Sequence, residues 1–343
     1  MQRLQDYANA FQDAISKALL YSPSVIVFGG DLLHNPRPDP KSMRIVLQSL
    51  IKLADSTQIV ICIGNHEIEG HLSTTYTPLF SDLHKNIHVL TTENPHVTIE
   101  IDNKRVGFHG FQYLRNRKIA EDTLFEISEQ VDDNDIDILC IHQAVERYLS
   151  PYEISISALR EISEKYNLIL LGHVHKHQKI DEIFDLKPAF YIGSTERISF
   201  NEHENRNGIL IFKDFNFREP EFLEVNSTSM KQIHEDLDKK TPQDINSHID
   251  KLININSDVK LLQINLDVEI LGDHLDIRHD WEQKYPEFTI LDVNVNPKLI
   301  ESAIKMEKIE ISDDIIREYF EKRGIGDKEL IDLCIDMYHK YAK

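Results

Sequence analysis

The chain has 343 residues and a formal net charge of −20. Hydrophobic residues make up 41% of it, which is enough for a folded core and excludes a wholly disordered chain. The length exceeds that of one small domain, and no apolar run approaches the roughly 20 residues of a membrane helix. The negative charge disfavours nonspecific nucleic-acid binding unless a local basic groove, metal ions or a partner supply the attraction.

Cysteine usage and the N-terminus bear on the compartment. Cys62, Cys140 and Cys334 are odd in number and far apart, so free thiols are favoured over disulfides or metal ligands. The first residues lack the basic and then apolar layout of a signal peptide. We therefore expect a cytoplasmic protein in a reducing compartment.

Helical patterns and short apolar runs alternate along the first half of the chain. Helices are predicted where apolar residues recur at helical spacing, at residues 4–20, 42–54 and 156–165. Four mostly apolar runs predict buried parallel strands, at residues 24–28, 58–63, 136–141 and 168–171. Shorter runs predict a second, more antiparallel sheet, at residues 97–101, 106–109, 189–192 and 209–212. The alternation predicts an α/β fold.

The pattern changes after residue 217. A helix over 242–252, with Pro242 in its first turn, precedes strand-like segments at 261–268 and 288–295. Two helices, 312–322 and 328–341, are predicted on either side of a glycine-containing turn. We therefore divide the chain into an α/β domain (1–217), a small α+β domain (218–300) and a helical segment (301–343).

Polar side chains that can bind metal follow each of the four buried strands. Asp31 follows the first strand, Asn65 the second and His142 the third, and His173 and His175 follow the fourth. Because ligands of open α/β sheets bind outside the carboxyl ends of the strands, these side chains should converge. Nitrogen and oxygen ligands without thiolate suit manganese, iron or zinc. Two such ions can activate a water and stabilise the leaving oxygen of a phosphate ester.

Each of these motifs also has a structural interpretation. Gly30-Asp31 after a strand is often only a turn, and Gly64-Asn65 favours left-handed turns. A single histidine at a strand end, such as His142, is commonly hydrogen-bonded structure. The metal site is favoured because all four motifs occur in this order, each at the end of an apolar run.

The order Gly-Asp, Gly-Asn-His-Glu, strand-end His and Gly-His-x-His resembles the pattern of calcineurin-like metallophosphoesterases. The closer resemblance is to SbcD/Mre-type double-strand-break repair nucleases, and it rests on residues 30–38, 141–143, 171–176 and 191–196. It implies a four-layer αββα sandwich in segment 1–217. It also implies a DNA-capping domain in 218–300 and, in 301–343, a segment that binds the coiled coil of an ATPase partner.

The resemblance assigns roles to residues of the motifs. It makes Asp31 the bridging ligand, and it implies that one manganese ion is held by Asn65, His142 and His173 and the other by His175. The implied catalytic residues are His66, beside Asn65 and able to supply a proton, and His34, near the scissile phosphate. The densest basic cluster is the candidate DNA contact, although a solvated loop is equally compatible with it: Arg115, Arg117 and Lys118.

One element of the family pattern has no counterpart. The family begins with a strand that ends in Asp-x-His and completes the metal held by His175, and no Asp-x-His precedes Asp31. A misassigned start codon, a fragment and a degraded nuclease site all remain open, and we expect an upstream truncation. The expectation is about one Mn²⁺ in this chain, against two in the full-length family form.

The resemblance implies a manganese-dependent DNA exo/endonuclease that acts on double-stranded DNA ends with an SMC-like coiled-coil ABC ATPase, in the nucleoid. It also implies a homodimer through segments 42–54 and 77–84. A general metallophosphoesterase acting on small substrates is one alternative. A scaffold that binds DNA ends without cutting them is another.

Overall fold

The computed structural model describes residues 2–70, 75–131, 133–149, 153–298 and 328–341, and residues 313, 316, 317 and 320 singly. The predicted helix 312–322 and the turn after it therefore lie almost wholly outside the described residues. The second predicted helix of that pair is present as α9 (Lys328–Tyr341). No helix in the described part of the chain is both long and apolar enough to cross a membrane.

The first sheet contains three parallel strands in the order β1 (Val25–Phe28), β2 (Gln58–Ile61) and β3 (Ile87–Val89). Helices α1 (Gln2–Leu19) and α2 (Pro40–Ala54) belong to the same part of the fold. The α2 helix begins two residues before the predicted start at 42. The Asp39 side chain caps it by accepting hydrogen bonds from the Lys41 and Ser42 backbone N–H groups, and Pro40 has no N–H that needs a partner.

The second sheet contains six strands in the order β4-β5-β6-β7-β9-β8. Its strands are β4 (His96–Ile101), β5 (Lys104–His109), β6 (Ile136–Ile141), β7 (Leu168–Leu171), β8 (Gln178–Lys179) and β9 (Ala189–Tyr191). The central pairs are parallel, whereas β4 and β8 pair antiparallel at the two ends. The accompanying helices are α3 (Arg117–Glu129), α4 (Ile156–Ser163) and α5 (Asp181–Phe184).

Three apolar clusters hold these elements in layers. One joins α2 to the first sheet through residues such as Leu50 and Ile61. A second lies between the two sheets and contains Val60 and Cys140. A third joins the second sheet to α3 and α4, with Leu124 and Leu159 fully buried. The predicted α/β fold with parallel strands is confirmed.

The predicted grouping of strands was wrong. The four strands predicted as buried do not share one sheet: β1 and β2 belong to the first sheet, whereas β6 and β7 are central in the second, beside β5 and β9. The prediction of burial was wrong for β1, which is only half-buried along its length. An apolar run indicates that a strand is covered on both faces, as it is for β6 and β7, whereas β1 lies at the edge of its sheet. It does not show which strand lies beside it, because hydrogen-bond pairing leaves no mark on side-chain periodicity.

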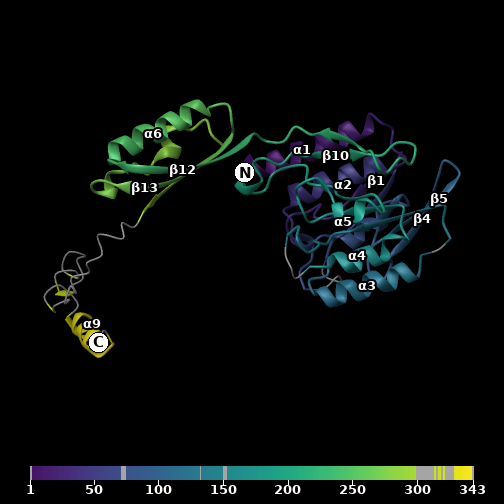
Figure 1. The fold of residues 1–343 in the computed structure, drawn as a ribbon, viewed down its shortest axis with the longest axis horizontal. Coiled ribbons are helices and arrows are strands. Elements are labelled where there is room, and N and C mark those ends of the chain that lie inside the picture. The colour runs from purple at the N-terminus through teal and green to yellow at the C-terminus, as the bar shows by residue number, and fades with distance from the viewer. Residues whose placement is uncertain are drawn as a thin grey trace.

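Residues 230–297 build a core of their own, called the small unit below (Figure 1). Its strands β12 (Met230–Lys240), β13 (Leu261–Ile270) and β14 (Ile290–Pro297) are parallel, and α6 (Pro242–Ile255) and α7 (Trp281–Lys284) accompany them. The antiparallel pair β10 (Gly208–Ile211) and β11 (Glu221–Glu224) precedes it. The described residues up to 224 are called the body. The predicted boundaries at 217 and 300, and a capping role, stay predictions.

Candidate metal centre

Asp31 and His173 lie in strained loops directly after strands β1 and β7. Their φ angles are 54° and 79°, in the left-handed region that residues with a side chain seldom adopt. Such strain persists only where the surroundings enforce it, and it concentrates at functional sites. The two strained residues also carry two of the ligand atoms described next.

Asp31, His142 and His173 offer ligand atoms that all lie within 4.8 Å of one another. His142 Nε2 is 3.2 Å from Asp31 Oδ2 and 3.2 Å from His173 Nδ1. Asn65 Oδ1 lies among them, 3.1 Å from His142 Nε2 and 2.9 Å from His173 Nδ1. These four residues form the acceptor cluster. The two sheets therefore bring the ends of β1, β2, β6 and β7 together at one edge.

The hydrogen bonds around the acceptor cluster indicate which of its atoms donate and which accept. His142 Nδ1 is 2.7 Å from the Gly29 carbonyl oxygen, which can only accept, so Nδ1 donates, and in the neutral form of the ring Nε2 carries a lone pair. That lone pair faces a carboxylate oxygen of Asp31 and the amide oxygen of Asn65. Burial lowers the pKa of His173 to about 4, so this ring is neutral near pH 7.

A divalent cation fits this arrangement. Converging lone pairs repel one another unless a positive charge lies between them. Neighbouring ligand atoms about 3 Å apart suit metal–ligand bonds of about 2.1 Å, and the mixed nitrogen and oxygen set suits a first-row metal. When bound, such an ion stabilises the negative charge that develops on a phosphate ester under attack.

Buried Glu67 ties two of the ligand loops together. Its carboxylate accepts hydrogen bonds from the Asp31 backbone N–H (3.0 Å), the Gly64 backbone N–H (2.9 Å) and Thr77 Oγ1 (2.8 Å). Burial raises the pKa of Glu67 to about 7. Gly64 must lack a side chain, because a Cβ there would lie 2.0 Å from Asp31 Oδ1. The glycine of the Gly-Asn-His-Glu motif is thus explained by close approach.

The two candidate catalytic histidines lie face to face beside this edge. The rings of His34 and His66 stack with centroids 4.6 Å apart. The His66 backbone N–H donates to Asp31 Oδ1 at 2.9 Å, which places His66 next to the cluster. Burial, and then the charge of His66, lower the pKa of His34.

His175 lies apart from the acceptor cluster. Its Nδ1 is 2.9 Å from Oε1 of Glu202, in the short helix η4 (Phe200–Glu202). That hydrogen bond raises the pKa of His175. The structure therefore brings Asp31, Asn65, His142 and His173 together, and it gives His175 a carboxylate partner that no sequence pattern had indicated.

The predicted basic contacts lie at the start of α3. Arg117 pairs with Glu121 at 3.1 Å and with Glu146 at 3.4 Å, so two carboxylates offset its charge. Arg115 and Lys118 are exposed.

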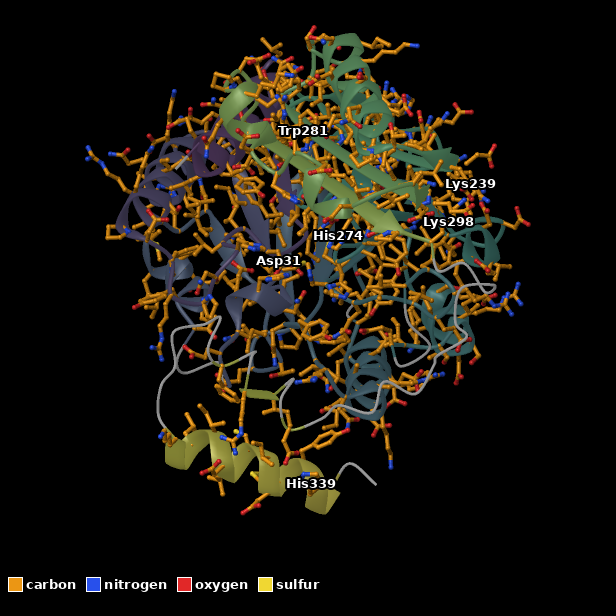
Figure 2. All side chains as sticks on the ribbon, turned by 90° about the vertical axis from the view of Figure 1, so that its left-hand side faces the viewer. Asp31, Lys239, His274, Trp281, Lys298 and His339 are labelled. Atoms are coloured by element: carbon orange, nitrogen blue, oxygen red, sulfur yellow. The ribbon has the colours of Figure 1, made fainter. Side chains whose placement is uncertain are left out.

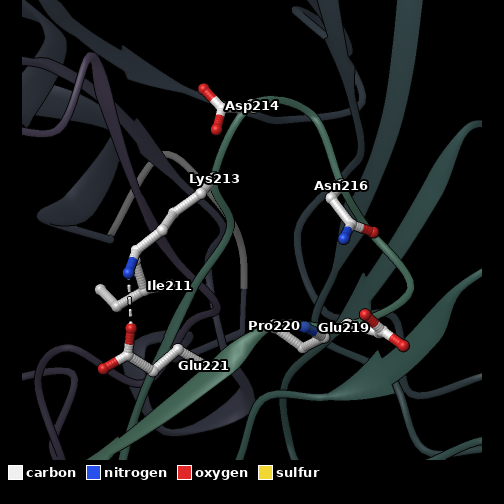
Figure 3. A pocket seen from close by; sticks show the side chains of 7 residues that line it. All are labelled: Ile211, Lys213, Asp214, Asn216, Glu219, Pro220 and Glu221. Atoms are coloured by element: carbon white, nitrogen blue, oxygen red, sulfur yellow. Dashed lines mark hydrogen bonds and ion pairs between the residues drawn. The ribbon is translucent and has the colours of Figure 1, made fainter.

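A hollow of about 500 Å³ is lined by the loop that joins β10 to β11, and none of the predicted site residues lines it (Figure 3). Lys213 and Glu221 on its wall are 2.7 Å apart and offset each other's charge. The candidate metal ligands therefore lie at the strand-end edge, of which Asp31 is labelled in Figure 2.

The described geometry is that of a phosphoesterase metal edge, and the family comparison agrees. The model of the calcineurin-like phosphoesterase family matches residues 1–177, so the chain belongs to that family. Within it, the chain is related to the Mre11 and SbcD double-strand-break repair nucleases.

Three relatives illustrate the range of similarity. The DNA double-strand break repair protein Mre11 of Methanocaldococcus jannaschii is 30% identical over 207 residues, which cover 59% of this chain and 54% of the relative. The SbcD subunit of the nuclease SbcCD from Staphylococcus saprophyticus is 26% identical, covering 61% and 60%. Mre11 of Sulfolobus acidocaldarius is 22% identical over 95% of this chain and 87% of its own. The structure of TT1561 from Thermus thermophilus aligns with 65% of this chain and 94% of its own at 13% identity, with a TM-score of 0.45.

Proposed function

We propose that this chain is a metal-dependent DNA exo/endonuclease subunit of a double-strand-break repair complex. The observation that carries the proposal is the acceptor cluster of Asp31, Asn65, His142 and His173. Relatives named as double-strand-break repair proteins and as part of a nuclease support DNA as the substrate. The chain spans about half the length of the first of these relatives, 54%, so substrate and partners are part of the proposal.

In this proposal the cluster holds one Mn²⁺ ion and His175 belongs to a second, shared through Asp31. His66 donates a proton to the leaving oxygen, and His34 stands near the scissile phosphate. The described residues offer four protein ligands to the first ion. They offer Asp31 and His175 to the second, and His175 also pairs with Glu202. We therefore expect about one tightly bound Mn²⁺ per chain, measured by native mass spectrometry, and two tight ions would contradict this count.

The proton donor is tested with His66→Ala and His66→Gln in manganese-dependent digestion of linear duplex DNA. General acid catalysis contributes about 10²- to 10⁴-fold, so cleavage should fall by that factor while metal content and DNA binding persist. The control is His88→Gln, which replaces a half-buried histidine on β3 with its ring beside Gln58. Near-normal turnover in both His66 variants would remove the proposed role.

Helix α9 supports a coiled-coil ATPase as partner. Ile331 and Ile335 are buried, whereas Leu333 and Met337 expose 56% and 53% of their surface. Deleting residues 308–343 should abolish co-purification with an SMC-like ATPase and leave manganese-dependent cleavage intact. A complex that survives the deletion would exclude this segment as the contact.

A homodimer is proposed through α2 and the segment 77–84. About half of the apolar residues there pack internally, including Leu50 and Phe80, but Leu79 and Leu83 expose 57% and 37% of their surface. Light scattering of wild type and of Leu79→Lys tests the contact. A wild type that is monomeric at every concentration would refute it.

The alternative is a scaffold that binds DNA ends without cutting them, and the pairing of His175 with Glu202 favours it. A chain that binds one Mn²⁺ and linear DNA but cleaves neither DNA nor small phosphodiesters would establish the scaffold. Cleavage of small esters without cleavage of DNA would instead indicate a general phosphoesterase.

A further inference from the structure

Tyr113 stands against both ligand histidines at the metal edge. Its ring centroid is 5.4 Å from that of His173, with planes 31° apart, and 6.3 Å from that of His142, nearly edge-on. The Tyr113 backbone N–H donates to the Ile63 carbonyl oxygen, two residues before Asn65. The ring is half-buried, so part of its surface faces solvent beside the acceptor cluster.

Glu153 reaches the same place from a different segment. Burial raises the pKa of Tyr113, and the Glu153 carboxylate raises it further through its charge and a hydrogen bond to the phenol. Burial likewise raises the pKa of Glu153, while the hydrogen bond from Tyr113 lowers it. A half-buried aromatic ring and a carboxylate therefore stand together beside His142.

A comparison within the body shows that this pair is not simply core packing. Tyr148 also donates to a glutamate, Glu182, at 2.7 Å, and its ring lies 5.4 Å from buried Tyr191. Tyr148 packs against the apolar cluster beneath α3 and α4, as a structural tyrosine should. Tyr113 belongs to none of the apolar clusters formed by the described residues. Its ring contacts are the imidazoles of the metal edge.

We propose that Tyr113 and Glu153 form a recognition wall that binds the nucleoside part of the substrate. This inference rests on the proposed nuclease function and deepens it. An aromatic face stacks on any nucleobase with little sequence preference. A carboxylate accepts hydrogen bonds from an exocyclic amino group or a sugar hydroxyl. Arg115, two residues along the chain, is exposed and brings a positive charge near Tyr113.

Binding separates this role from a structural one. Calorimetric titration in Mn²⁺ compares deoxyguanosine 5′-monophosphate with inorganic phosphate, which lacks the nucleoside. Wild type should bind the nucleotide more tightly. Base–aromatic stacking is worth about 5- to 100-fold in affinity, so Tyr113→Leu should weaken nucleotide binding on the order of 10-fold and leave phosphate binding unchanged. Tyr113→Phe keeps the ring and should stay within about threefold of wild type.

Glu153→Gln should weaken nucleotide binding by about fivefold, because it removes a charged acceptor. Tyr148→Phe is the matched control and should leave the affinity for both ligands unchanged. In wild type loaded with diamagnetic Zn²⁺ in place of Mn²⁺, nuclear Overhauser effects should connect guanine protons with the Tyr113 ring, a contact that needs no variant. Equal affinity of wild type for nucleotide and phosphate would overturn the wall, as would equal weakening of both ligands in Tyr113→Leu.

Failure of the wall is distinguishable from failure of the proposed function. If wild type binds the nucleotide through Tyr113 but cleaves neither duplex DNA nor bis(p-nitrophenyl) phosphate, the recognition wall is supported and the proposed nuclease function is refuted. If wild type cleaves DNA but binds nucleotide no better than phosphate, the nuclease assignment stands and the wall falls.

Discussion

Two polar regions of this molecule, each built on parallel strands, differ in how their polar side chains are paired. One gathers acceptors, and the other pairs donors with acceptors. At the metal edge of the body, the Asp31 carboxylate, the Asn65 amide oxygen and the His142 lone pair point at one another. On the small unit, the face of the sheet carrying Gln263 and Asn265 is also polar, but its amide hydrogens point at acceptors.

On the small unit, a row of hydrogen-bonded polar side chains, called the ladder below, runs across all three strands. Gln232 donates to Gln263 at 2.7 Å, and Gln263 donates to Asp292 at 2.6 Å. Two residues further along the strands, Asn294 donates to Asn265 at 3.1 Å. These residues lie directly opposite one another in the parallel register. Such cross-strand pairs are the usual way in which a sheet satisfies its polar side chains.

The difference teaches how to separate a ligand site from polar structure. A polar group costs free energy when it is removed from water without a partner, so structural polar residues come as matched donors and acceptors. The metal edge breaks that rule with an excess of acceptors, and its strained backbone at Asp31 and His173 holds them in place. A site that binds a cation is the consistent explanation.

The largest expected effect comes from Asp31→Asn, which removes the negative charge from the acceptor cluster. Losing an outer partner of a metal site costs 10- to 100-fold in affinity, and losing a ligand should cost on the order of 10³-fold for Mn²⁺. Calorimetry measures this loss. The matched control is Asp292→Asn in the ladder, which should leave Mn²⁺ affinity unchanged. An unaltered Mn²⁺ affinity in Asp31→Asn would refute the conclusion that the acceptor cluster, unlike the ladder, binds a metal ion.

The next effect tests whether the small unit has its own core. Ile264 is fully buried on its central strand, so Ile264→Ala should destabilise the small unit by about 3 kcal/mol. The only tryptophan of the chain, Trp281, is buried there and reports unfolding of the small unit in urea. Mn²⁺ affinity should not change. A parallel loss of metal binding would show that body and small unit unfold as one.

A smaller effect is expected from breaking the ladder. Gln263 donates to Asp292 and accepts from Gln232, so Gln263→Ala should cost about 1 kcal/mol of unfolding free energy, followed by Trp281 fluorescence. The control, exposed Gln283→Ala, should be neutral. Equal stability of the two variants would mean that hydrogen bonds to water replace those of Gln263 without a loss of unfolding free energy.

The smallest effect depends on pH. Burial tends to raise the pKa of Asp250, but hydrogen bonds from Lys284 and Tyr285 lower it below the usual 3.8. A lowered folded-state pKa contributes stability above that usual value and loses it as the pH falls through the lowered pKa. Because solvent screens this pair, Asp250→Asn should cost about 0.5 kcal/mol near pH 6 and nothing near pH 2. A difference that persists at pH 2 would refute the electrostatic origin.

The sequence alone determined much of the local structure and the core of the candidate site. Helix α2, strand β6 and helix α6 form within a few residues of the predicted positions, because periodicity and caps act locally. Strand β12 had not been predicted, since its alternation carries charged residues on a largely solvated face. Asp31, His142 and His173 were identifiable because residue type and a place after an apolar run are both visible in the chain.

Only the tertiary structure decided which elements meet. It placed the four buried strands in two sheets whose carboxyl ends share one edge. It gave His175 a partner in Glu202, and it set Tyr113 against the ligand histidines. These contacts join segments tens of residues apart, and they depend on strand pairing and sheet packing. A sequence specifies them through the sum of many weak interactions, so no single motif reveals them.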